Sequence, residues 1–371
     1  MNAFNPILKK PNPDFDSLVR VLAGEEEATR VHLMELVLDA EIMQAITEQY
    51  LDQKWIPDTE ETKEAYIQQT AELFYRLGFD FAVEGVWRSI WKNHPSLQSP
   101  STEDTAGKFS RGIREWANEG RGLITSWETL EQFPWEKITV DYRPYELLAR
   151  SLPEGMKIVV SSSFFEHVLE NLLGYEGLFY LMYDDPDLVT EVFYRWGQKV
   201  YDYYKTVVTM DRMGAVFHAD DLGFKTSVLL PPEYLRQHVF PWFKKYADLA
   251  HEQGLQYWYH CCGNVYETGI IEDLIEDIHI DGFHSFENVI IDPKVFKKNY
   301  GERVAMLGGM DMDNLCQMSE DTLRSTIREL LGNCMPRRFA LGTGNTVANY
   351  VPLNNYLVLL DEARRWSTGP H

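Results

Sequence analysis

The sequence has 371 residues, and its 35 lysine and arginine residues against 57 aspartate and glutamate residues give a formal net charge of −22. Hydrophobic residues make up 44% of the chain, which is typical of a packed globular protein and too rich for a disordered one. The acidic balance argues against binding to nucleic acid or to an anionic membrane surface, because both need a basic face. No apolar run reaches the roughly 20 residues that span a bilayer. The N-terminus lacks the features of a signal peptide, so we expect a soluble cytoplasmic protein.

Eight short apolar runs alternate along the chain with longer segments of helical periodicity. The runs cover residues 30–36, 80–86, 156–161, 214–220, 255–260, 279–285, 303–309 and 338–342, and helices are predicted over 185–208, 231–254 and 319–333. The nearly continuous hydrophobicity of the runs indicates parallel strands covered on both sides. A doubly wound sheet also fits, but eight runs favour a single (β/α)8 TIM barrel over residues 1–371.

Two segments do not fit the regular alternation. Residues 1–28 include KKPNPDFDS and are expected to form an N-terminal arm or short helix outside the barrel. Residues 87–155 form a long stretch between the second and third runs, and 93–108 within it are rich in proline, serine and threonine. We interpret 87–155 as an insertion near the barrel mouth.

Polar residues follow nearly every predicted strand, and in a TIM barrel the chemistry takes place at these carboxyl ends. We assign Glu84, Asp220 and Asp221 to acid–base catalysis, with one of the adjacent aspartates expected to be structural. The remaining residues are candidates for binding a small-molecule substrate: Glu35, His218, His284, Glu287, Thr343 and Asn345. For any one of them the alternative is a cap at a strand end.

His260 and Cys262 form the most suggestive local pair. Residues i and i+2 of a strand face the same side, so an imidazole and a thiolate here could share one zinc ion. A catalytic zinc needs a third protein ligand and an open position. The alternative is a hydrogen-bonded histidine beside a semi-buried thiol, and the spacing alone leaves both open.

The segment VFHADDLGFKTSVLLPPEYLRQHVFPWFKKYADLAHEQGLQYWYHCCGNV (216–265) resembles the uroporphyrinogen decarboxylase superfamily, as do residues 163–189, 282–311 and 339–345. This superfamily also contains zinc-dependent methyltransferases that act on methyl-corrinoid proteins. The resemblance implies a (β/α)8 barrel with one cleft at its carboxyl-end rim. In the methyltransferases a His-x-Cys pair and a later cysteine bind zinc; here Thr343 stands at the position of that cysteine. Glu35, His218, Asp220, Asp221 or Glu287 would have to complete the site.

Three functions follow from these residues. The leading hypothesis is zinc-assisted methyl transfer between a small methylated substrate and a corrinoid carried by a partner protein. The substrate could be aromatic. The alternative is a metal-free decarboxylase of a porphyrinogen or another acid that uses Glu84, although the arginine motif of the true decarboxylases is missing from the N-terminus. The third is a non-catalytic binder of a tetrapyrrole or corrinoid. The resemblance and the 13% aromatic content favour a homodimer.

Overall fold

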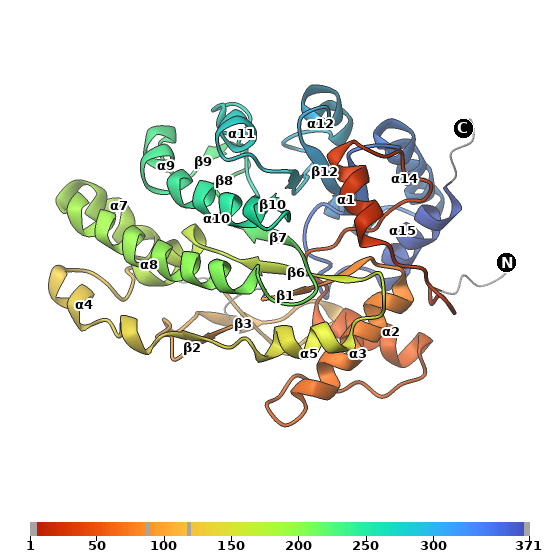
Figure 1. Cartoon of the computed structure of the whole chain (residues 1–371), viewed down its shortest axis with the longest axis horizontal. Coiled ribbons are helices and arrows are strands. Elements are labelled where there is room, and N and C mark those ends of the chain that lie inside the picture. Colours follow the sequence, from red (N-terminus) through yellow and green to blue (C-terminus); the bar gives the residue numbers. More distant parts are fainter. Residues whose placement is uncertain (1–5, 86–89, 117–119, 367–371) are drawn as a thin grey trace.

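The computed structural model describes residues 6–85, 90–116 and 120–366, and its centre is a parallel sheet that curls into a barrel-like wall (Figure 1). The strand order is β1-β6-β7-β10-β11-β12-β13, and every neighbouring pair is parallel. The strands are β1 (Phe81–Glu84), β6 (Lys157–Ser162), β7 (Met213–Ala219), β10 (Gln256–His260), β11 (Gly282–His284), β12 (Ala305–Met310) and β13 (Phe339–Thr343). This confirms an α/β fold with a curled parallel sheet, consistent with a TIM-like barrel.

The prediction of a regular strand over residues 30–36 is wrong. Leu33 and Leu38 form only isolated parallel bridges, to Leu341 and Val347 beside β13. A bend at Leu36 separates the two bridges, so no continuous ladder forms. On the other side β1 pairs with β6 alone among the described residues. We call the resulting gap in backbone pairing, between residues 33–38 and β1, the seam.

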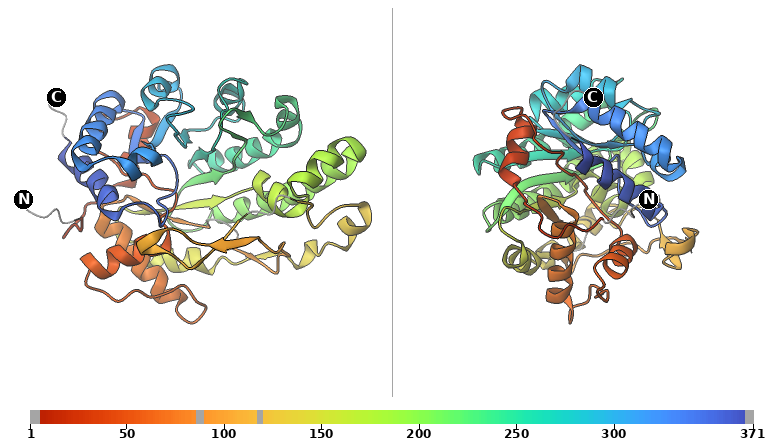
Figure 2. Two further views of the ribbon diagram at one scale, coloured as in Figure 1. Left: turned by 180° about the vertical axis from the view of Figure 1, so that it is seen from behind. Right: turned by 90° about the vertical axis from the view of Figure 1, so that its right-hand side faces the viewer.

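Helices surround the sheet, as the two further views show (Figure 2). The longer helices are α1 (Phe15–Ala23), α2 (Ala40–Tyr50), α3 (Lys63–Leu77), α5 (Arg143–Ser151), α7 (Tyr175–Asp184), α8 (Pro186–Val207), α9 (Pro232–His238), α10 (Phe240–Glu252), α12 (Pro293–Tyr300), α14 (Glu320–Cys334) and α15 (Leu353–Arg365). Shorter turns are α6 (Phe165–His167), η3 (Val168–Leu172), α11 (Ile270–Glu272), η4 (Asp273–Asp277) and α13 (Met312–Gln317). None of the helices in the described part of the chain combines the length and hydrophobicity needed to cross a membrane.

The helices predicted over 185–208 and 319–333 are confirmed as α8 and α14. The single helix predicted over 231–254 is instead two, α9 and α10, which meet at Val239. Pro241 lies in the first turn of α10. Proline has no N–H to donate into a preceding turn and clashes with it, so the helix ends and begins again.

The barrel interior is filled by a compact apolar cluster to which strand residues contribute alternately. Phe81, Phe217, Trp258 and Leu307 belong to it. Helix α1 completes the cluster from the amino ends of the strands, where the Phe15 ring centroid lies 6.2 Å from that of Trp258. The N-terminal segment therefore contributes a short helix whose apolar face packs against the barrel interior rather than lying apart from it.

The segment predicted as an insertion is built from small elements. They are β2 (Trp91–Lys92), β3 (Ser101–Glu103), η1 (Gly107–Phe109), β4 (Ile113–Glu115), α4 (Trp127–Gln132), η2 (Trp135–Lys137) and β5 (Thr139–Val140). Asn349, beyond β13, donates a hydrogen bond to Asp104 Oδ2 at 2.8 Å, so the β3–β4 hairpin reaches the carboxyl-end side of the barrel. Helix α5 falls within 87–155 but packs against α3 and β6 as a barrel helix. Residues 86–89 and 117–119 lie outside the described part of the chain.

Candidate metal centre

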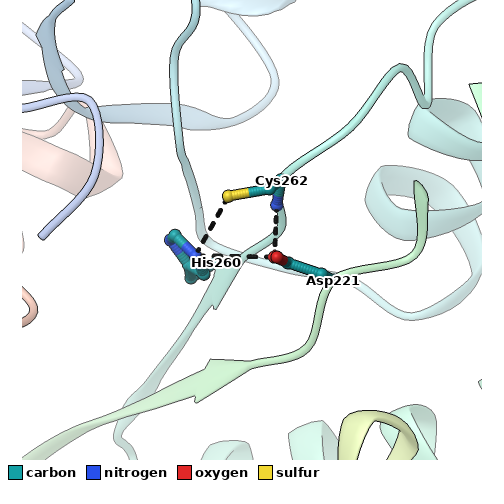
Figure 3. A group of neighbouring side chains, drawn as sticks. All are labelled: Asp221, His260 and Cys262. Atoms are coloured by element: carbon teal, nitrogen blue, oxygen red, sulfur yellow. Dashed lines mark hydrogen bonds and ion pairs between the residues drawn. The ribbon is translucent and has the colours of Figure 1, made fainter. Parts of the chain in front are cut away.

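The end of β10 places His260 and Cys262 side by side at the carboxyl end of the barrel. His260 shares its strand face with Trp258, which belongs to the interior cluster. The distance from Cys262 Sγ to His260 Nε2 is 3.7 Å (Figure 3). The pair expected from the spacing is therefore close enough for both side chains to reach one ion.

Asp221 adds a third donor to this pair. The parallel register pairs Ala219 of β7 with His260 of β10, so the residues two positions further on, Asp221 and Cys262, also meet. Asp221 Oδ1 accepts a hydrogen bond from the backbone N–H of Cys262 at 2.6 Å and lies 3.6 Å from His260 Nε2. The three donor atoms lie within 4.8 Å of one another. The Asp221 side chain is 35% exposed, so the group is open to solvent on one side.

A second histidine fixes which nitrogen of His260 is free. His284 Nε2 lies 2.9 Å from the carbonyl oxygen of Thr343, which can only accept, so this nitrogen carries the proton and donates. Burial lowers the pKa of His284 to about 3, so the ring is neutral and its Nδ1 accepts. His260 Nδ1 lies 2.6 Å from that atom and donates to it. The lone pair of His260 Nε2 is therefore free and faces Asp221 and Cys262, and burial lowers the pKa of His260 to about 4.

The thiol of Cys262 is surrounded by hydrogen-bonding side chains. Asn345 Nδ2 lies 3.2 Å from Cys262 Sγ, and Ser285 Oγ lies 3.5 Å from it. Burial and the Asp221 carboxylate raise the pKa of the thiol well above its usual range. A divalent cation would reverse this effect, because metal coordination deprotonates a thiol.

The donor set fits zinc. Zinc binds cysteine sulfur, histidine nitrogen and carboxylate oxygen, and a catalytic site has three protein ligands with one open position. Asp221, His260 and Cys262 supply one donor of each kind. His284 supplies the outer-shell acceptor that metal-binding histidines use.

Asp220 and His218 lie behind this group and are completely buried. The Asp220 carboxylate accepts hydrogen bonds from the backbone N–H groups of Phe164, Phe165 and Glu166 at 2.8–2.9 Å. His218 Nε2 lies 2.8 Å from the same carboxylate, and its Nδ1 lies 2.9 Å from Tyr204 Oη. Asp220 is thus the structural member of the aspartate pair, and our expectation that His218 contacts substrate is not supported by its placement.

Glu35 and Thr343 form another buried pair at the ends of the first and last runs. Glu35 Oε1 accepts a hydrogen bond from the Thr343 N–H at 3.1 Å, and Glu35 Oε2 lies 2.6 Å from Thr343 Oγ1. Burial raises the pKa of Glu35 to about 8, so the carboxyl is mostly protonated at neutral pH. It can then donate to Thr343 Oγ1, whose own hydroxyl donates to the carbonyl of Asn345. Neither side chain is among the donors around Cys262.

Glu84 and Glu287 differ in their relation to the centre. Phe81 and Val83 pack in the interior cluster, so Glu84 lies on the outer face of β1 and points away from the barrel interior. This placement does not support our assignment of Glu84 to acid–base catalysis, which assumed that its side chain lines the barrel mouth. Glu287 is partly buried near the centre, where burial and then Asp221 raise its pKa.

Sequence reasoning missed two polar residues at the centre. Glu166 lies in the first turn of α6, and burial together with Asp221 and Asp220 raises its pKa well above the usual range. Ser285 follows β11 and contacts the Cys262 thiol. Glu166 could have been found by extending the search from the strand end at Ser161–Ser163 into the following helical turn.

The group of nitrogen, oxygen and sulfur donors lies at the carboxyl ends of the strands. This is where enzymes with a TIM-like barrel have their active sites. Residues 146–366, more than half of the chain, match the family described as uroporphyrinogen decarboxylase (URO-D). The chain belongs to the uroporphyrinogen decarboxylase family, which confirms the resemblance found in the sequence and supports an enzyme. No curated protein sequence matches the chain.

Solved structures show the same fold at low sequence identity. A methyltransferase from Methanosarcina mazei is 17% identical, with a TM-score of 0.67 over 95% of this chain and 99% of that one. A putative vitamin-B12-independent methionine synthase from Listeria monocytogenes is 12% identical, with a TM-score of 0.51 over 92% and 99%. A B12-independent methionine synthase from Shewanella sp. W3-18-1 is 8% identical, with a TM-score of 0.50 over 91% and 96%.

Proposed function

We propose that this chain is a methyltransferase that moves a methyl group between a small methylated substrate and a corrinoid on a partner protein, with zinc held by Asp221, His260 and Cys262. The observation that carries the proposal is the triad itself, with its donor atoms within 4.8 Å of one another. The methyltransferase fold neighbour from Methanosarcina mazei is consistent with it. The corrinoid protein, a homodimeric assembly and a cytoplasmic location stay predictions.

The side chains divide the work around the ion. When bound, zinc would act as a Lewis acid on the oxygen or sulfur that carries the methyl group. His284 holds His260 in the tautomer that presents Nε2. Asn345 and Ser285 orient the sulfur of Cys262. Glu166, beside Asp221, holds a proton at its carboxyl that can be donated to a departing alkoxide.

The decarboxylase alternative loses its main support in the structure. It depended on Glu84 as an acid facing the substrate, and that side chain points out of the barrel. The family match leaves this reaction as the comparison assay. A coloured protein without turnover would instead indicate the third function, a tetrapyrrole or corrinoid binder.

The first test is the metal content of the purified protein, measured by plasma mass spectrometry. We expect near-stoichiometric zinc in the wild type, and loss of that zinc in Cys262→Ala and Asp221→Asn. Cys316→Ala is the matched control, because Cys316 is a free and partly buried cysteine that does not belong to the triad. Zinc retained equally in Cys262→Ala would refute the site.

The second test is methyl transfer to cob(I)alamin from a panel of methoxylated aromatic compounds and methyl thiols. The proposal predicts turnover that chelation abolishes and zinc restores. Release of carbon dioxide from a carboxylic acid substrate after chelation, with no methyl transfer from any donor, would favour the decarboxylase.

A further inference from the structure

A second cavity lies at the seam, outside the barrel interior. It has a volume of about 200 Å³ and lies between residues 36–38, β1, α3 and α5. None of its lining residues belongs to the triad of Asp221, His260 and Cys262. We call it the seam pocket. It exists because residues 33–38 pair with β13 and not with β1, which leaves the wall without backbone pairing at this point.

Most of the seam pocket wall is apolar. The hydrocarbon side chains that line it come from α2, α3, α5 and two connecting segments: Leu36, Leu38, Met43, Ile67, Phe74, Ile90 and Leu148. An apolar cavity of about 150 Å³ is large enough to bind benzene. The seam pocket can therefore take a ring or a branched alkyl group with a short polar arm.

Two polar groups face this apolar space. Glu84 lies on the outer face of β1 and lines the pocket. One of its carboxylate oxygens accepts a hydrogen bond from the Gly85 N–H at 3.0 Å, and the other has no hydrogen-bond partner among the described residues. Thr70 Oγ1 on α3 is buried, lines the same pocket beside Tyr66 and makes no hydrogen bond of good geometry. A ligand that donates hydrogen bonds would satisfy both groups.

The charged side chains around the seam pocket favour a positively charged ligand. The nearby cations are already paired, because Lys63 Nζ lies 2.5 Å from Asp58 and Lys92 Nζ lies 3.4 Å from both Asp141 and Glu60. Glu84 makes no ion pair among the described residues and is the uncompensated charge of the pocket. Burial raises its pKa to about 6 although the charge of Lys63 acts against this rise, so the group is mostly ionised at neutral pH without an ion pair of its own.

We propose that the seam pocket binds a small organic amine, with its ammonium group donating to Glu84 and Thr70 and its hydrocarbon part packed against the apolar wall. An ammonium supplies both the missing positive charge and enough donors for two acceptors. The site is independent of the proposed methyl transfer, because it shares no residue with the metal centre.

The experiment is a calorimetric titration of the full-length protein with benzylamine, benzyl alcohol and benzoate at pH 7.5. We expect saturable binding of benzylamine, at least tenfold weaker binding of benzyl alcohol and no binding of benzoate. Glu84→Gln should weaken benzylamine binding at least tenfold, and Thr70→Val should weaken it to a lesser degree. Glu64→Gln, which changes an exposed carboxylate on α3 that does not line the pocket, should leave it unchanged.

The remaining outcomes decide the inference. Binding of benzylamine should persist in Cys262→Ala and after chelation, which separates this site from the metal centre. Absence of saturable benzylamine binding to the wild type, or equal affinity in Glu84→Gln and wild type, would overturn the proposal. Affinity for benzyl alcohol equal to that for benzylamine would overturn the assignment to a cation.

Discussion

Replacing Glu35 by glutamine should make the protein more stable, by an amount that grows with pH. Glu35 is 1% exposed, and burial raises its pKa from 4.5 to about 8. The folded state therefore holds the proton more tightly than the unfolded state, and wild-type stability falls as pH rises between these two values. Glutamine has the shape of the protonated carboxyl, so it can donate to Thr343 Oγ1 and accept from the Thr343 N–H without carrying a charge.

The size of the effect follows from the two pKa values. Each unit of difference corresponds to about 1.4 kcal/mol, so the wild type should lose less than about 1 kcal/mol by pH 5. The loss should reach about 3 kcal/mol at pH 7 and about 5 kcal/mol at pH 9. The glutamine variant lacks this loss, so its advantage over the wild type should follow the same curve.

The assay is urea unfolding of wild type and Glu35→Gln at pH 5, 7 and 9, followed by tryptophan fluorescence and circular dichroism. Glu48→Gln on the exposed side of α2 is the matched control, and its difference from wild type should not vary with pH in this way. Parallel stability curves for Glu35→Gln and wild type from pH 5 to pH 9 would show that Glu35 ionises normally and would refute the reasoning.

Four other substitutions have expected effects that follow from the same structure. His284→Phe removes the acceptor for His260 Nδ1, so zinc affinity measured by chelator competition should fall about 10- to 100-fold; unchanged affinity would contradict the tautomer assignment. Gly308→Ala should destabilise by about 1–3 kcal/mol from its φ of +89° alone, and more because the new Cβ would lie 2.8 Å from the His284 ring. Gly332→Ala, in α14 with open space around it, should instead stabilise by up to about 1 kcal/mol in the same unfolding assay. Asp80→Asn removes the charge of a buried carboxylate that pairs with an arginine and a histidine, so the free energy of unfolding should fall by about 3 kcal/mol. A decrease below about 1 kcal/mol would show that the pairs contribute little.

The glycine and histidine predictions share one physical basis. Gly308 lies directly against the His284 ring and the Thr343 carbonyl. A Cβ at position 308 would lie 2.8 Å from the ring and 2.2 Å from the carbonyl oxygen. A side chain there must displace the group that sets the His260 tautomer. Gly308→Ala should therefore also lower zinc affinity, whereas Gly332→Ala should not.

The apolar runs predicted most of the barrel because strand hydrophobicity is a local property of the sequence. Seven of the eight runs are strands of one parallel sheet. The exception, residues 30–36, is as apolar as the others but bends at Leu36. Local hydrophobicity does not report whether a neighbouring strand is in register to pair with it, so the seam could not be predicted.

The metal centre, too, could be predicted only in part from the sequence. The i, i+2 rule brings His260 and Cys262 to one face from the sequence alone. The choice of Asp221 over four other candidate ligands depended on the pairing of Ala219 with His260 across two strands. That register is set by tertiary packing and leaves no trace in the spacing along the chain.

The sequence by itself determined the family, the run of parallel strands and the His-x-Cys pair, because each depends on residues close together in the chain. Only the tertiary structure decided that Asp221 faces the centre, that Asp220 binds backbone N–H groups and that Glu84 points out of the barrel. Adjacent residues of a strand face opposite sides, whereas residues two positions apart face the same side. A shift of one residue along a strand therefore moves a carboxylate from the site to the outer wall. The packing of the whole barrel determines which residues face inward.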